Sequence, residues 1–170
     1  MQLNQDIIEK AKKVISSAEF SKLILNTKIN EDTSHKKEVK NLFKFYKDDE
    51  ISFNEQLCRE FILFCLAHLE LNDNLPDLTV VISGDKEKFE TFAFYTTDTK
   101  IAAVYGVGRH ILDVFRSLAH ELVHFKQDIN NEISQEEAGD ENDGVRIENE
   151  ANSVAGVIMR KYGREHPELY

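Results

Sequence analysis

The chain has 170 residues, 41% of them hydrophobic, which suits a single domain over residues 1–170 with a sizeable core. Its formal net charge of −10 argues against a nucleic-acid partner, because phosphate contacts require clustered lysine and arginine. No apolar run reaches membrane-span length, and the start Met1 to Asp6 lacks the charged and apolar regions of a signal peptide. We therefore expect a cytoplasmic protein without a membrane partner.

The first 75 residues are predicted to be helical. Apolar periodicity indicates a helix over Gln5–Leu25 and a shorter one near Lys37–Lys47. The sequence Ser52-Phe53-Asn54-Glu55 is a capping box that starts a strong helix to Leu71. Cys58 and Cys65 lie two turns apart in that helix, too far for a disulfide and without a CxxC spacing, so we expect reduced core thiols and not zinc ligands.

A small three-stranded sheet is predicted next, because short segments rich in β-branched and aromatic residues follow the break at Asn72 to Pro76. The expected strands are Leu78–Ser83, Thr91–Thr96 and Lys100–Tyr105. The turn Thr97-Asp98-Thr99 makes the last two a hairpin. The fold class is therefore α+β.

Arg109–Ile129 is predicted to be a helix in the centre of the domain, because apolar residues occupy most of its circumference. Its polar residues include a single stripe at i, i+4, i+7 and i+11 spacing: Asp113, Ser117, His120 and His124. A buried polar stripe requires a use, and metal binding explains it better than hydrogen-bonded core histidines.

The segment His120-Glu121-Leu122-Val123-His124 has the HExxH pattern. On a helix the two histidines lie one turn apart on one face, so both imidazoles can reach one ion. Glu121 lies roughly 100° round the helix from His120, beside the ligands. A carboxylate there suits the general base of a metal-assisted hydrolysis.

An acidic stretch from Asp128 to Asp143 follows that helix. The sequence Asp140-Glu141-Asn142-Asp143-Gly144 has only part of the ligand spacing of a calcium loop, so we expect a solvated loop bordering the substrate cleft. Such a loop would disfavour acidic substrates.

The third metal ligand is expected on a helix over Arg146–Arg160, which Gly163 is expected to stop. Glu148 and Asn152 are four apart, and small residues on their face would let this helix approach the histidines. Glu148 would bind the metal, while Asn152 would hold a histidine through its other ring nitrogen. Glu150, about 160° away from Glu148 on the helix, remains the competing ligand.

A buried HExxH helix, a loop and a helix with Glu-x-x-Ala-Asn together resemble the gluzincin branch of zinc metallopeptidases. The stretch Gly108–Gln127, including its lead-in from Arg109 to Arg116 and its Lys126-Gln127 exit, is similar to uncharacterised metallopeptidases of tailed phages. This resemblance covers about residues 89–170, and the first 75 residues show little of it.

The resemblance implies a zincin-like fold that holds one zinc ion per chain through His120, His124 and Glu148, with Glu121 as catalytic base. It implies a zinc-dependent peptidase acting on a protein or peptide, in the host cytoplasm if a phage encodes the chain. The small sheet of zincins can hold an extended substrate along its edge strand. Lys100–Tyr105 is our candidate for that strand, although the sequence does not show which strand lies at the edge.

Alternatives remain at this point. His166, Tyr105 and Arg109 are candidate transition-state donors, but the first two can be peripheral structural residues and Arg109 can cap a helix or pair with a carboxylate. The remaining histidines, His35, His68 and His110, show no ligand spacing. A peptide deformylase would need a cysteine ligand in a setting that neither cysteine has. A non-catalytic zinc-binding phage assembly or host-interaction protein is the stronger alternative, although such a site has no need of Glu121.

Overall fold

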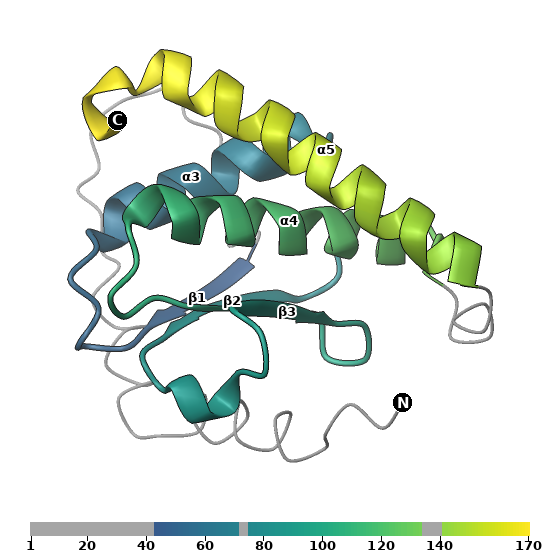
Figure 1. Ribbon diagram of the computed structural model, residues 1–170, viewed down its shortest axis with the longest axis horizontal. Coiled ribbons are helices and arrows are strands. Elements are labelled where there is room, and N and C mark those ends of the chain that lie inside the picture. The colour runs from purple at the N-terminus through teal and green to yellow at the C-terminus, as the bar shows by residue number, and fades with distance from the viewer. Residues whose placement is uncertain (1–42, 72–74, 134–140) are drawn as a thin grey trace, which may run out of the picture. The chain divides into compact units, whose positions relative to one another are not determined.

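The computed structural model describes residues 43–71, 75–133 and 141–170, and the helix predicted over Gln5–Leu25 lies outside them. The described part is an α+β fold of three α-helices and a four-stranded mixed sheet (Figure 1). In chain order the elements are β1 (Phe43–Lys47), α3 (Glu55–His68), β2 (Leu78–Ser83), η1 (Lys86–Lys88), β3 (Ala93–Thr96), β4 (Ile101–Tyr105), α4 (Ile111–Ile129), α5 (Glu141–Glu165) and η3 (Pro167–Leu169).

The strand order is β1-β2-β4-β3, with β1, β2 and β4 parallel and β3 antiparallel to β4. Strand β4 is therefore internal, and the prediction that Lys100–Tyr105 lies at the edge is wrong. The first four residues of β4, Ile101 to Val104, are all buried, as expected for a strand paired on both sides. Edge positions belong to β1 and β3.

Strand β1 replaces the end of the helix predicted near Lys37–Lys47, so the expected three strands become four. The sequence Phe-Lys-Phe-Tyr-Lys alternates, and Phe43 and Phe45 both pack against the core while Lys44 is exposed. This period of two is the signal of a strand with one buried face. The prediction of a helix is therefore wrong for Phe43–Lys47.

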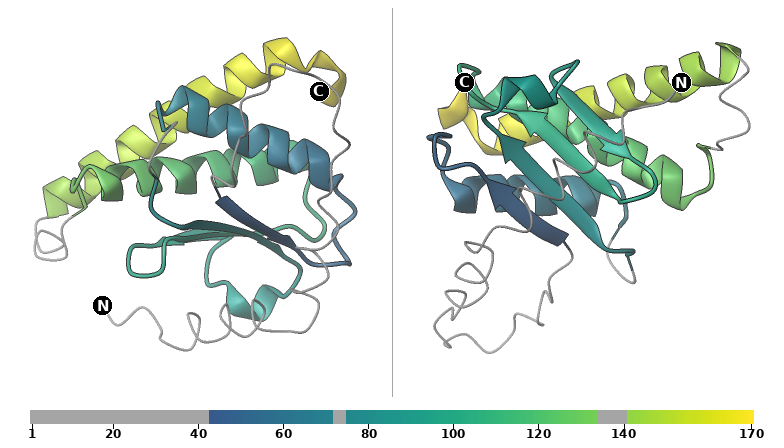
Figure 2. Two further views of the ribbon diagram at one scale, coloured as in Figure 1. Left: turned by 180° about the vertical axis from the view of Figure 1, so that it is seen from behind. Right: turned by 90° about the horizontal axis from the view of Figure 1, so that it is seen from below.

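All three helices lie on one face of the sheet (Figures 1 and 2). Helix α4 packs on β3 and β4 and also contacts α3 and α5. Where the helices meet, the rings of Phe61 and Phe115 stack with centroids 4.0 Å apart, and Tyr162 of α5 meets Phe61 edge-on at 4.8 Å. Side chains of Val80, Ile82, Ala102 and Val104 complete the core from the sheet.

The helix ends differ from the predicted ones. Asn54 rather than Ser52 caps α3, since its side chain accepts a hydrogen bond from Leu57 N. Helix α5 begins at Glu141, which shortens the predicted acidic loop, and continues through Gly163, which was predicted to stop it. A Cβ at Gly163 would lie 2.5 Å from the Tyr170 ring, so the glycine makes room for the C-terminal turn.

None of the helices in the described part of the chain combines the length and hydropathy needed to cross a bilayer.

Candidate metal centre

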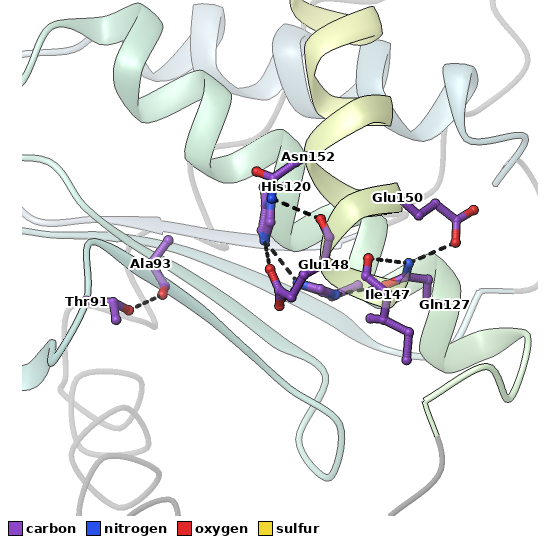
Figure 3. A network of polar contacts seen from close by, with 9 residues as sticks. Thr91, Ala93, His120, Gln127, Ile147, Glu148, Glu150 and Asn152 are labelled. Atoms are coloured by element: carbon purple, nitrogen blue, oxygen red, sulfur yellow. Dashed lines mark hydrogen bonds and ion pairs between the residues drawn. The ribbon is translucent and has the colours of Figure 1, made fainter. Parts of the chain in front are cut away.

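His120, His124 and Glu148 come together where α5 crosses the C-terminal half of α4 (Figure 3). The two Nε2 atoms are 3.0 Å apart, and each lies 3.2 Å from one oxygen of the Glu148 carboxylate. The ligand atoms of the three residues all lie within 4.8 Å of one another. The predicted set is thus brought together from two helices.

Close helix packing delivers Glu148 to the histidines. Ala151 and Ala155 of α5 are 0% and 1% exposed, so no long side chain holds this face of α5 away from α4. The imidazoles are largely buried, with side-chain exposures of 19% and 11%, whereas the Glu148 side chain is 58% exposed. The group is therefore fixed on its helix side and open to solvent on the other.

This donor set fits zinc. Two imidazole nitrogens and one carboxylate are a usual set of protein ligands in catalytic zinc sites, which leave a position open. Zinc bond lengths of about 2.0–2.1 Å in a tetrahedron give ligand–ligand separations of about 3.3 Å. The observed separations of 3.0 and 3.2 Å therefore match such a centre within a few tenths of an ångström.

Glu121 lies beside the ligands but is far less accessible, at 6% exposure. Burial, together with the nearby charge of Glu148, raises the pKa of its carboxyl group to about 8. A carboxylate held out of water is a stronger base than an exposed one, which suits a group that takes a proton. A metal cation bound next to it would lower this pKa.

The protonation of His120 is also shifted. Burial and the neighbouring His124 lower the pKa of His120, while Glu148 and a hydrogen bond with Asn152 oppose that shift. The neutral imidazole, which is the form that binds metals, is favoured by the net effect. The role of Asn152 in holding a histidine ring stays a prediction, since its side-chain nitrogen donates to Glu148 O at 2.9 Å.

Gln127 was named from the sequence only as part of the Lys126-Gln127 exit, and no role was assigned to it. Its side-chain oxygen lies 2.8 Å from His124 Nδ1, and its amide nitrogen lies 3.1 Å from both Ile147 O and Glu150 Oε2 (Figure 3). Glu150 is therefore directed to Gln127 and not to the histidines. The signal was available, because Gln127 follows His124 by three residues and so lies on the same helix face.

A cleft of about 700 Å³ opens beside the three ligands. Glu121 and the ligands form one wall, and residues of β3, including Ala93, Phe94 and Tyr95, form the other. The described lining also includes Thr91, Thr97, Glu132, Ile133, Gly144 and Ile147. Three of its residues are acids, and none of those described is Lys or Arg.

None of the three predicted transition-state donors is among the described residues that line this cleft. His166 stacks on Tyr162 at the other end of α5 and pairs with Glu168. Arg109 donates to the carbonyls of Tyr105 and Asp113 and to Ser117 Oγ. The upper part of the polar stripe on α4 thus has a structural use, and only its lower part forms the candidate metal centre.

Other predicted residues have local uses. His110 caps α4 through Leu112 N, and His68 contacts the Phe64 carbonyl. Cys58 and Cys65 are free and buried, and burial raises the pKa of the Cys58 thiol to about 11. Such thiols are poor metal ligands. His35 and most of the candidate calcium loop lie outside the described residues or have undescribed side chains.

Comparison with known proteins returns no match: no family model, curated protein or solved structure is similar enough to this chain to be recognised.

Proposed function

We propose that the protein is a zinc-dependent peptidase with a zincin-like fold, and that His120, His124 and Glu148 hold one zinc ion per chain. The supporting observation is the meeting of three ligand atoms within 4.8 Å beside a buried carboxylate, at the wall of an open cleft. A purely structural zinc site needs neither the buried carboxylate nor the cleft.

Each residue has a distinct task in the proposed hydrolysis. Zinc would supply Lewis acidity, which acidifies water and polarises a carbonyl oxygen. Glu121 accepts the proton of the attacking water and then donates it to the leaving amine. The low accessibility of Glu121 keeps its carboxylate from being solvated, which keeps it basic.

Strand β3 offers a binding edge for an extended peptide. Phe92 O accepts a hydrogen bond from Tyr105 N, so by antiparallel alternation the backbone groups of Ala93 and Tyr95 point away from β4, toward the edge of the sheet that the described strands form. Thr91 Oγ1 donates to the Ala93 carbonyl, with the oxygens 2.6 Å apart. A substrate strand would therefore pair with Tyr95 and compete with Thr91 for Ala93.

The first test is metal content. Protein purified without added metal should contain about one zinc per chain, and Glu148→Ala should weaken zinc binding far more than Glu150→Ala. Protein that binds no metal would remove the proposed function. Equal effects of the two substitutions would remove Glu148 as the third ligand.

The second test separates an enzyme from a non-catalytic zinc protein. Proteome-wide cleavage profiles of wild type, Glu121→Gln and Glu132→Gln should show that Glu121→Gln keeps zinc and loses cleavage. Glu132 lines the same cleft without lying among the ligands, so Glu132→Gln should keep cleavage and is the matched control. Zinc binding without any cleavage by wild type would support the assembly or host-interaction alternative.

A further inference from the structure

We infer that Gln127 is a positioning residue that fixes which nitrogen of His124 carries the proton, and that the backbone of α5 orients it. The inference rests on the proposed zinc site, because it concerns how the histidine is prepared to bind metal. It adds a residue that none of the HExxH and Glu-x-x-Ala-Asn motifs contains.

Gln127 is 1% exposed, and its side-chain amide is held from both sides. The nitrogen lies 3.1 Å from Ile147 O, a backbone carbonyl that can only accept a hydrogen bond, and 3.1 Å from a Glu150 carboxylate oxygen. Reversing the amide would place its oxygen against two acceptors. The NH2 group must therefore face α5, and the oxygen must face α4.

That orientation determines the tautomer of His124. The Gln127 oxygen lies 2.8 Å from His124 Nδ1, and an amide oxygen can only accept, so Nδ1 must carry the hydrogen. In the neutral ring Nε2 then has no hydrogen, and its lone pair faces His120 and Glu148. The proton position on a ligand of α4 thus follows from a carbonyl group of α5.

The Nε2 lone pair of His124 also faces the second imidazole. His120 Nε2 lies 3.0 Å away, so His124 accepts the hydrogen bond between the two rings.

The consequence is a coupling between the docking of α5 and the proton position on His124. The Ile147 carbonyl orients the Gln127 amide, and the Glu148 side chain is itself the third ligand. When α5 docks on α4, it supplies a ligand and sets the tautomer of His124 in one step.

Long-range ¹H–¹⁵N NMR correlations of the imidazole rings in the metal-free protein, recorded where the histidines are neutral, test this directly. Wild type should show the Nδ1–H tautomer at His124. An Nε2–H tautomer at His124 in wild type would overturn the inference without any variant. That result would stand whether or not zinc binds, so it is separable from failure of the proposed function.

Variants then assign the effect to Gln127. Gln127→Leu should shift His124 toward the Nε2–H tautomer and weaken zinc binding about 10- to 100-fold in competition with a chelator. In the double variant Gln127→Glu with Glu150→Gln, the carboxylate at position 127 can accept the hydrogen of His124 Nδ1. The amide at position 150 can then donate to that carboxylate. This double variant should recover the tautomer and most of the affinity. An unchanged tautomer in Gln127→Leu would contradict the inference.

Gln56→Leu is the matched control, because the Gln56 amide also donates to a carboxylate, that of Glu60, but on the exposed face of α3. It should leave the His124 tautomer and the zinc affinity at their wild-type values. If Gln127→Leu does not fold, the double variant and the wild-type spectrum still decide the question.

Discussion

The two halves of α4 are both buried, but they differ in what they bury. The N-terminal half places Val114, Phe115 and Leu118 in the core, each at 0% exposure. The C-terminal half places Glu121, His124 and Gln127 at 6%, 9% and 1% exposure. Both halves bury apolar side chains, since Leu122, Val123 and Phe125 are buried as well, but only the C-terminal half also buries polar ones.

Burial of apolar rings in the first half stabilises the folded state, whereas burial of the Glu121 carboxylate in the second half opposes folding. Gln127 forms a hydrogen bond with His124, but no comparable partner stabilises ionised Glu121 in the described residues. Substitution of a core ring and substitution of Glu121 should thus change stability in opposite directions.

The largest expected effect is in the apolar half. Phe115→Ala removes a ring that stacks on Phe61 and meets Tyr162 edge-on, so it should lower the free energy of unfolding by about 3–5 kcal/mol. Urea denaturation measures the change. Val145→Ala, at a side chain that is 60% exposed, is the control and should change stability by less than about 0.5 kcal/mol. A comparable loss in the free energy of unfolding of both variants would show that the ring cluster stabilises the fold no more than an exposed side chain does.

The polar half should respond in the opposite sense. In metal-free protein Glu121→Gln should raise the free energy of unfolding by a few kcal/mol at pH 8, since one pKa unit corresponds to about 1.4 kcal/mol. The folded-state pKa of about 8 lies above the ordinary 4.5, so wild type loses stability as pH rises from 4.5 to 8. The advantage of Glu121→Gln should grow over that window and then level off.

Urea denaturation of both metal-free proteins at pH 5 and pH 8 checks this sign. An advantage that shrinks between these pH values would contradict the buried, hard-to-ionise state of Glu121. Excess zinc should reduce the difference, because a bound cation stabilises the ionised carboxylate.

A smaller effect on stability is expected at Arg109, just before the first residue of α4. Arg109→Leu removes donors to Tyr105 O, Asp113 O and Ser117 Oγ and should lower the free energy of unfolding by about 1–3 kcal/mol. Because Arg109 is not among the described cleft residues, kcat of the folded protein should be unchanged. A large fall in kcat at unchanged folded fraction would restore Arg109 as a transition-state donor.

Much of α4 could be predicted from the sequence, because helical spacing alone places His120 and His124 on one face. The choice of Glu148 over Glu150 also agrees with the geometry, since only Glu148 joins the histidines. Both inferences depend on positions within single helices. Local periodicity determines such positions before any tertiary contact forms.

The errors concern pairing between distant segments. Strand β1 was missed, and β4 was taken for the edge, because strand order depends on contacts that local periodicity does not encode. Gln127 was passed over for the same reason, since its importance arises from Ile147 and Glu150 on another helix. Hydrogen bonds between different strands and helices therefore could not be predicted from the sequence.

The smallest expected effect concerns the link between the polar half of α4 and the edge strand. The Tyr95 hydroxyl donates to Asp128 near the C-terminus of α4, and Lys100 pairs with the same carboxylate at 2.6 Å. This holds β3, one wall of the cleft, at a fixed place relative to His124. Tyr95→Phe should therefore lower the free energy of unfolding by only about 0.5–1.5 kcal/mol.

The kinetic consequence of Tyr95→Phe distinguishes a binding edge from a catalytic wall. If β3 holds the substrate by backbone pairing, KM should rise about two- to fivefold while kcat stays near wild type, since the ligands and Glu121 are untouched. Tyr170→Phe, which also removes a hydroxyl hydrogen bond but at an exposed terminus, should change neither constant. A fall in kcat with unchanged KM would instead place the Tyr95 hydroxyl in the chemical step, and would join the edge strand to the polar half of α4 as one catalytic unit.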